Sequence, residues 1–165
     1  TVAVNFSASQ FSYAGVDDMI ERVVKETGID PQRLEIEITE SLFLNHSPDV
    51  MATLKRIKEL GVRIAMDDFG TGYSSLNYLT QFPFDKIKID RSFVSQLSND
   101  PQIAAIISSI VGLGRSLSVD ITAEGVETDE QVTLLQAAGC SIVQGFLFGA
   151  PTRAGHAPPV EQATA

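Results

Sequence analysis

Two neighbouring aspartates, Asp67 and Asp68, end an apolar run and precede a glycine-rich stretch in the segment RIAMDDFGTGYSS, residues 63–75. Like charges at the end of a buried strand repel each other, so the pair needs a positive partner. Carboxylate oxygens suit divalent cations such as Mg²⁺, Mn²⁺ or Ca²⁺, and two such ions about 3.5–4 Å apart form the centre of two-metal phosphoryl hydrolases. The pair therefore indicates a two-metal site, beside which Gly70 and Gly72 permit a tight loop.

Further polar residues fall on the same face as Asp67. Side chains alternate along a strand, so each run separates into two sets. In LEIEIT, VRIAMDD, KIKID and ITAE the branched aliphatic set suits packing under helices, and the other set lines the enclosed interior. The lining residues at or near the carboxyl ends of the strands are Asn5, Glu37, Asp67, Asp90 and Glu124, with Glu40, Asp68 and Glu127 just beyond them. Parallel barrels carry their active sites at this end, so we expect one acidic site.

Cations must balance these acids, because an unpaired buried charge is costly. Lys88 is one such cation, and divalent metal would supply the rest. Taken alone, Glu40 or Glu127 would more often be a cap or a surface charge, and Asp68 would cap the following loop. Lys88 alone is as readily a solvated lysine as a catalytic one. Together, however, five polar residues from five strands lie on the same face, and this agreement favours a common site over a set of unrelated caps.

Histidine and cysteine give no sign of zinc. His46 and His156 lie in a helix-start loop and in the tail, so neither is expected to act in catalysis. Cys140 is the single cysteine, which excludes an internal disulfide, fits a reducing compartment and predicts a buried packing role.

These residues must be positioned by alternating strands and helices. The strand-like runs are 2–7, 34–39, 62–68, 85–90, 120–126 and 142–148, and the expected helices are 16–27, 47–60, 74–82, 101–117 and 129–138. This α/β order predicts parallel strands covered by helices, in a closed barrel or an open doubly wound sheet. No glycine-rich phosphate loop follows the first strand, which favours the barrel. The Ala- and Pro-rich tail, 152–165, is expected to be loose.

Composition excludes other classes of protein. The 165 residues fit one domain, and 12 Lys and Arg against 21 Asp and Glu give a net charge of -9, which argues against binding nucleic acid. No apolar run approaches the roughly 20 residues that span a bilayer, so we expect a soluble segment without a membrane span.

The chain resembles the EAL-domain phosphodiesterases of bacteria, which hydrolyse cyclic di-GMP. The resemblance covers residues 1–151 and rests on VNFSASQF, LEIEITES, DDFGTGYSSLNYL, KIKIDRSFV, AEGVET and QGFLF, in that order. It implies a TIM-like (β/α) barrel with Mg²⁺ or Mn²⁺ at its mouth and hydrolysis of cyclic di-GMP to linear pGpG.

The resemblance also implies roles for single residues. Asn5, Glu37 and Asp67 match metal ligands, and Asp68 matches a ligand of the second metal. Lys88 and Glu124 match the residues that hold or activate the attacking water. The remaining matches are Glu40, which steadies the DDFGTGYSS loop, Glu127, a supporting carboxylate, Gln144, near the site, and Asp90, the aspartate of KID.

The Glu-Ala-Leu signature that names the family is absent, and the runs provide about six of the eight strands of a closed barrel. This predicts an N-terminally truncated domain whose catalysis is impaired. Alternative functions are a non-catalytic cyclic di-GMP receptor or signalling scaffold and, more weakly, protein interaction without nucleotide. The resemblance further implies that a homodimer is possible, that sensory or cyclase domains flank this one in the parent protein, and that the chain is cytoplasmic or the cytoplasmic part of a membrane-bound bacterial protein.

Overall fold

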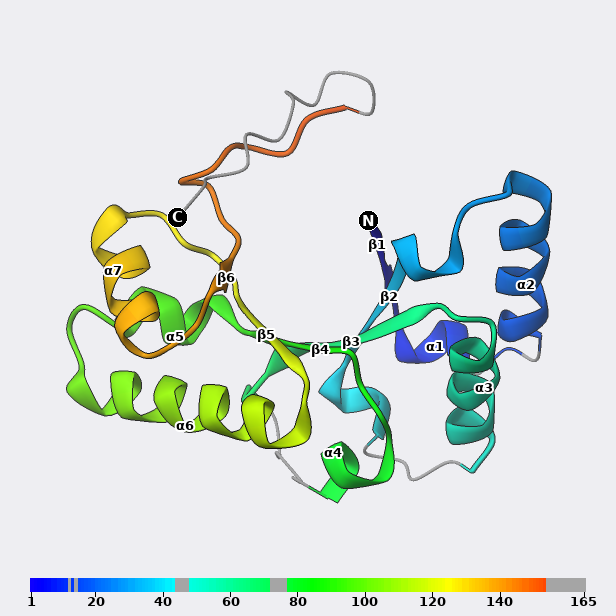
Figure 1. The fold of residues 1–165 in the computed structure, drawn as a ribbon, viewed down its shortest axis with the longest axis horizontal. Helices are drawn as coiled ribbons and strands as arrows, with labels where there is room; N and C mark the ends of the chain where they lie inside the picture. Colours follow the sequence, from blue (N-terminus) through cyan, green and yellow to red (C-terminus); the bar gives the residue numbers. More distant parts are fainter. Residues whose placement is uncertain (12, 14, 44–47, 72–76, 154–165) are drawn as a thin grey trace.

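The computed structural model describes residues 1–11, 13, 15–43, 48–71 and 77–153. In this part of the chain a single sheet holds six strands, all parallel and ordered as in the sequence. They are β1 Val2–Phe6, β2 Leu34–Thr39, β3 Arg63–Phe69, β4 Lys86–Ile89, β5 Asp120–Ala123 and β6 Ile142–Val143. Figure 1 shows that the sheet is strongly curved. It forms a partial TIM-like barrel, which confirms the predicted fold class.

Helices connect the strands and lie on the convex side of the sheet (Figure 1). The α-helices are α1 Ala8–Phe11, α2 Val16–Thr27, α3 Pro48–Glu59, α4 Asn77–Gln81, α5 Arg91–Gln96, α6 Pro101–Leu117 and α7 Asp129–Ala137, with the 3₁₀ turns η1 Pro31–Arg33 and η2 Glu40–Phe43. The Asp100 side chain caps α6 at its start, and Gly28 ends α2 in the left-handed conformation.

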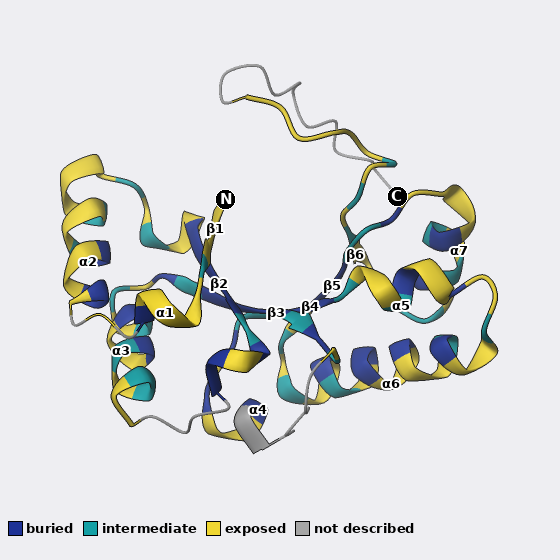
Figure 2. Cartoon of the chain, turned by 180° about the vertical axis from the view of Figure 1, so that it is seen from behind, coloured by how far each residue is buried: buried dark blue, intermediate teal, exposed yellow. Residues whose placement is uncertain are grey.

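The hydrophobic core lies between the sheet and the helices. Its strand residues are the branched or long aliphatic side chains of alternate positions: Ile36, Ile38, Ile64, Met66, Ile87 and Ile89, none more than 1% exposed. Leu54 and Ile57 of α3 and Ile107 of α6 meet them from the helix layer and are equally buried. This confirms the predicted division of β2, β3 and β4 into an aliphatic face and a polar face. Figure 2 shows that the central strands of the sheet are largely buried.

The polar face carries ion pairs near the amino ends of the strands. The Lys86 ammonium lies 2.6 Å from Oε1 of Glu35, and the Arg63 guanidinium lies 2.9 Å from Asp120. These residues lie on β2, β3, β4 and β5, and Glu35 is only 1% exposed. The candidate site lies at the other end of the same face.

β1 is an edge strand of the described sheet. Its two valines, Val2 and Val4, are 55% and 39% exposed, whereas the neighbouring β2 is buried almost throughout. Within the described residues, no helix combines the length and the apolar character that a membrane crossing requires.

Several predicted boundaries are wrong. The runs 120–126 and 142–148 are strands only over Asp120–Ala123 and Ile142–Val143. Beyond these strand ends the backbones of Val126 and Gly145 pack together, and a Cβ at residue 145 would lie 2.1 Å from the Val126 carbonyl oxygen. Helix α5 was not predicted. Residues 72–76, which include Gly72 and begin the predicted helix 74–82, lie outside the described part, as do 44–47 and 154–165 with both histidines.

Candidate active site

Lys88 is the centre of an acidic cluster at the carboxyl end of the strands. Its position on β4 turns its side chain to the polar face, and the residue as a whole is 4% exposed. Its ammonium lies 2.9 Å from Oε1 of Glu37, 3.1 Å from Oδ1 of Asp67 and 2.7 Å from Oε1 of Glu124. One cation thus joins carboxylates from β2, β3 and the turn after β5, as strand alternation predicted.

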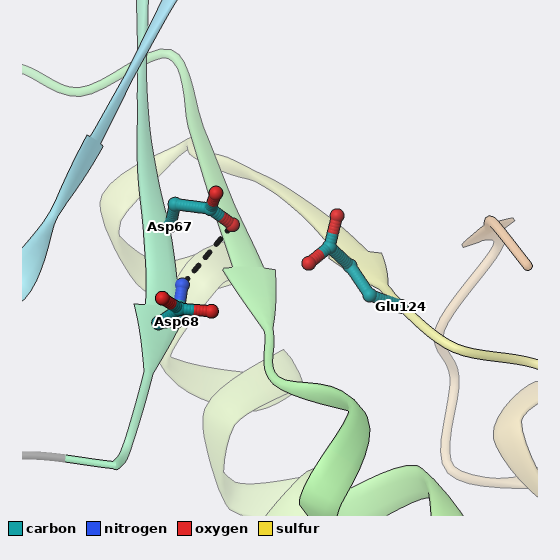
Figure 3. Close-up of side chains that lie close together, drawn as sticks. All are labelled: Asp67, Asp68 and Glu124. Atoms are coloured by element: carbon teal, nitrogen blue, oxygen red, sulfur yellow. Dashed lines mark hydrogen bonds between the residues drawn. The ribbon is translucent and has the colours of Figure 1, made fainter. Parts of the chain in front are cut away.

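Asp68 joins the cluster through its backbone conformation. It follows Asp67 directly, so regular alternation would turn its side chain to the opposite face. Instead the pairing of β3 with β4 shifts register between Met66 and Phe69, and Asp68 has φ 54°, in the left-handed region. Such irregularities re-aim side chains. One carboxylate oxygen from each of Asp67, Asp68 and Glu124 lies within 4.8 Å of the others (Figure 3).

Asn5 reaches the cluster from β1. With its amide nitrogen turned toward the acids, it donates to Oδ2 of Asp67 and to Oε2 of Glu37, both at 3.2 Å. The opposite amide orientation would present the carbonyl oxygen instead, which is the atom that binds a metal ion. All four residues predicted as metal ligands therefore lie at one end of the sheet.

The charges in this cluster do not balance. Glu37, Asp67 and Glu124 all pair with the ammonium of Lys88, and the carboxylate of Asp68 lies beside those of Asp67 and Glu124. Burial lowers the pKa of Lys88, but its hydrogen bonds with Glu124 and Glu37 outweigh burial, so the net effect raises the pKa. Burial raises the pKa of Glu124, and the charges of Asp67 and Glu37 raise it further against the opposing effect of Lys88.

The pKa of Asp68 is raised as well, first by burial and then by the charges of Asp67 and Asp90. Carboxylates that resist ionisation near one another are a sign of missing positive charge. The donors around them are oxygen atoms, which Mg²⁺, Mn²⁺ and Ca²⁺ prefer. The cluster therefore fits divalent metal.

Asp90 and Glu40 take different positions. Asp90 caps α5, accepting a hydrogen bond of 3.0 Å from the backbone N–H of Ser92. Burial raises the pKa of Asp90, but the hydrogen bonds from Ser92 outweigh burial and lower it. Glu40, in η2, is 5% exposed, and neither carboxylate oxygen has a hydrogen-bond partner among the described residues. The loop that Glu40 is predicted to steady lies largely in the undescribed residues 72–76.

Glu127 and Gln144 have exposed side chains, and their backbones shape the turn that bears Glu124. The Glu127 N–H donates to Oε1 of Gln131 at 2.7 Å. Gln144 donates its N–H to the Ala123 carbonyl at 2.8 Å and accepts from the Val126 N–H at 3.0 Å. Their predicted binding roles remain predictions.

Fold and site together define an α/β protein with a partial barrel of parallel strands and a cluster of acidic side chains whose oxygen atoms fit divalent cations. The chain belongs to the EAL domain family, whose model matches residues 1–151.

Two kinds of relative agree with this assignment. The chain is 45% identical over 150 residues to the bifunctional diguanylate cyclase/cyclic di-GMP phosphodiesterase MucR of Pseudomonas aeruginosa, covering 91% of this chain and 22% of MucR. The solved MucR phosphodiesterase in complex with cyclic di-GMP matches with a TM-score of 0.88 at 44% identity, over 93% of this chain and 62% of that one.

Klebsiella pneumoniae BlrP1, solved with manganese and cyclic di-GMP, matches with a TM-score of 0.84 at 34% identity, over 90% of this chain and 38% of that one. BlrP1 has also been solved with calcium and cyclic di-GMP. The chain thus spans about a fifth of the curated MucR protein and less than two thirds of the solved MucR chain.

Proposed function

We propose that residues 1–151 form the catalytic part of a metal-dependent phosphodiesterase that hydrolyses cyclic di-GMP to linear pGpG. Membership of the EAL family supports the substrate, as does the 45% identity to MucR, a bifunctional diguanylate cyclase/cyclic di-GMP phosphodiesterase. The observation that carries the proposal is the Lys88 ammonium, buried among Glu37, Asp67 and Glu124 with Asp68 turned in beside them.

The proposed cofactor is a pair of Mg²⁺ or Mn²⁺ ions. Asn5, Glu37 and Asp67 would hold one, and Asp68 would hold the other. The excess of carboxylates over cations supports this assignment, as does the manganese present in BlrP1. Bound divalent ions polarise a phosphate and lower the pKa of a bound water.

The side chains of Lys88 and Glu124 have complementary parts in the proposed hydrolysis. A water oxygen bonds to phosphorus as the bond from phosphorus to one ribose 3′ oxygen breaks. The 5′ phosphate stays at one end of the linear product, and the 3′ oxygen takes up a proton from solvent and becomes the hydroxyl at the other end. Lys88 has a raised pKa and keeps its proton, so it would not act as a base. To hold the water, it would give up one of the bonds that its three N–H groups make to Glu37, Asp67 and Glu124. Glu124, bonded to Lys88, is placed to accept the proton that the water loses.

Three further residues support the site in this proposal. Glu40 would steady the loop after β3, which is consistent with a buried carboxylate whose oxygens need donors. Glu127 and Gln144 would contact the ligand or the loops around it from the turn after β5 and the segment after β6.

A turnover assay tests the function directly. The chain is incubated with cyclic di-GMP in Mg²⁺, Mn²⁺, Ca²⁺ or EDTA, and products are separated by chromatography. We expect pGpG with Mg²⁺ or Mn²⁺ and none with EDTA. In the full-length parent, Asp67→Asn should abolish turnover while leaving the fold intact, and Lys88→Ala should reduce the rate more than nucleotide affinity. Metal-dependent turnover at the normal rate by Asp67→Asn would refute its assignment as a ligand.

Calorimetry in Ca²⁺ separates catalysis from binding. Heat on adding cyclic di-GMP, together with no turnover in Mg²⁺ or Mn²⁺, would favour the non-catalytic receptor. Absence of heat at high nucleotide concentration would count against both cyclic di-GMP functions.

We further infer that the chain works as one part of a multidomain cytoplasmic protein, next to sensory or cyclase domains, and that it pairs as a homodimer. The bifunctional MucR, of which the chain covers 22%, supports the first point. Light scattering of the purified chain would test the second. The exposed valines leave β1 as an open edge of the described sheet. We therefore infer that this chain alone hydrolyses cyclic di-GMP slowly. A polypeptide with additional strands beside β1 that showed the same rate would contradict that inference.

A further inference from the structure

Helix α5 begins between the two turns that carry Asp68 and Glu124. Asp90 caps the helix, and the backbone N–H of Phe93 donates to the Asp90 carbonyl at 3.1 Å, which fixes the first turn. We call residues 91–93 the α5 wedge. Its two contacts with the turns are both made through glycines.

The first contact joins Phe93 to Gly70. A Cβ built on Gly70 would lie 2.8 Å from Cε2 and 2.9 Å from Cζ of Phe93, so the edge of the ring covers the glycine Cα. Gly70 has φ 95° and stands two residues after Asp68, itself left-handed at φ 54°. The ring is half-buried against the core, so it is a firm surface under this turn.

The second contact joins Arg91 to Gly125, the residue after Glu124. A Cβ on Gly125 would lie 2.4 Å from Cβ and 3.3 Å from Cα of Arg91. Gly125 has φ 70° and is held from its other side by the hydrogen bond from the Val126 N–H to the Gln144 carbonyl. One short rigid element therefore touches the backbone beside both acids.

We propose that Phe93 is a positioning residue that, through Gly70, holds the Asp68 carboxylate within reach of Asp67 and Glu124. The inference rests on the proposed metal site. An unsupported turn would let Asp68 return to the more favourable right-handed or extended backbone, which would turn its carboxylate toward the other face. Residues that orient ligands in this way typically change metal affinity or activity about 10–100-fold when they are removed.

Direct metal binding tests the proposal without relying on turnover. Mn²⁺ bound to the chain is measured from the loss of the EPR signal of free Mn²⁺, for the wild type, Phe93→Ala and Phe93→Leu. We expect Phe93→Ala to weaken Mn²⁺ binding about 10–100-fold, with Phe93→Leu between it and the wild type. The matched control is Val94→Ala, which removes a side chain that is 0% exposed from the same helix. It should lower stability and leave Mn²⁺ affinity unchanged.

Amide exchange measured without metal gives an independent readout. The Asp68 N–H donates to Oδ1 of Asp67 at 3.1 Å, and the Thr71 N–H donates to the Asp68 carbonyl at 3.3 Å. Both amides should exchange faster in Phe93→Ala than in Val94→Ala. Unchanged exchange, or Mn²⁺ affinity reduced equally by both substitutions, would overturn the positioning role. If the wild type binds no Mn²⁺, the proposed metal function fails, and exchange at Asp68 and Thr71 then decides alone whether Phe93 holds the turn.

Discussion

Replacing Lys88 with methionine removes the one ammonium from the cluster while keeping a side chain of similar length. In the wild type that ammonium bonds to Glu37, Asp67 and Glu124, and the lysine side chain is 6% exposed. Removing one partner of a buried ion pair costs about 3–5 kcal/mol, because the remaining charge stays buried and uncompensated. For a domain of this size each kcal/mol lowers Tm by roughly 2–4 °C, so we expect a fall of about 6–20 °C.

The assay is thermal and urea unfolding in EDTA, with Lys25→Met as the matched control. Lys25 pairs with Glu21 on the surface of α2, where its side chain is 71% exposed, so its removal should cost less than about 0.5 kcal/mol. Adding Ca²⁺ should then narrow the gap between Lys88→Met and the wild type, because the freed carboxylates bind the cation more tightly. A ligand at 100 times its Kd stabilises by about 2.7 kcal/mol.

Two results would refute this reasoning. A loss below about 1 kcal/mol would mean that the Lys88 ion pairs contribute little beyond their desolvation cost. A loss that Ca²⁺ leaves unchanged would mean that the carboxylates, once freed from the ammonium, do not form a cation site.

Three further predictions concern the same elements. The pKa of Glu124 is raised in the folded state, so protonation of Glu124 stabilises the fold. This contribution to the free energy of unfolding is fully present below the ordinary pKa of 4.5 and is lost as pH rises through the raised pKa. Glu124→Gln in EDTA should therefore match the wild type in Tm at pH 4 and exceed it at pH 7.5, and a constant difference would contradict the shift. Asp68→Ala should be less stable than Asp68→Asn by about 1–2 kcal/mol in urea, since asparagine tolerates the left-handed φ of 54°; equal midpoints would remove that explanation. Gly145→Ala should lower the free energy of unfolding by about 1–3 kcal/mol, because the new Cβ would lie 2.1 Å from the Val126 oxygen. Gly112→Ala in α6 should raise it by about 0.5–1 kcal/mol, because the new Cβ would have nothing within 4 Å.

The sequence predicted the regular part of this molecule well, because strand alternation is a local property. The placement of Glu37, Asp67, Lys88 and Glu124 on one face required only parity along each strand, and the structure brings all four together. Helix α6 was predicted at the bounds the structure has, since Asp100 and Pro101 give a strong start signal.

The parts that sequence reasoning missed depend on contacts between distant segments. Beyond the early ends of β5 and β6, Gly145 packs on Val126, and these two residues lie 19 residues apart in the chain. Helix α5 was not predicted although Asp90 is a good N-cap. The sequence KID is typical of a strand end, and six helical residues give little periodicity. Asp68 was predicted at the site from its position beside Asp67 and from the resemblance, but the left-handed backbone that turns its side chain there was not predicted.

The excess of carboxylates around Lys88 has an evolutionary consequence. Three acids share the ammonium of Lys88 and a fourth, Asp68, lies beside two of them, so neutralising an acid by mutation relieves repulsion, whereas losing the lysine increases it. Substitutions that neutralise these acids are therefore easier for the fold to accept than the loss of Lys88, and they can even stabilise the fold. A lineage without a ligand that needs all four acids would drift toward well-folded descendants that keep the barrel and lose the acids one at a time.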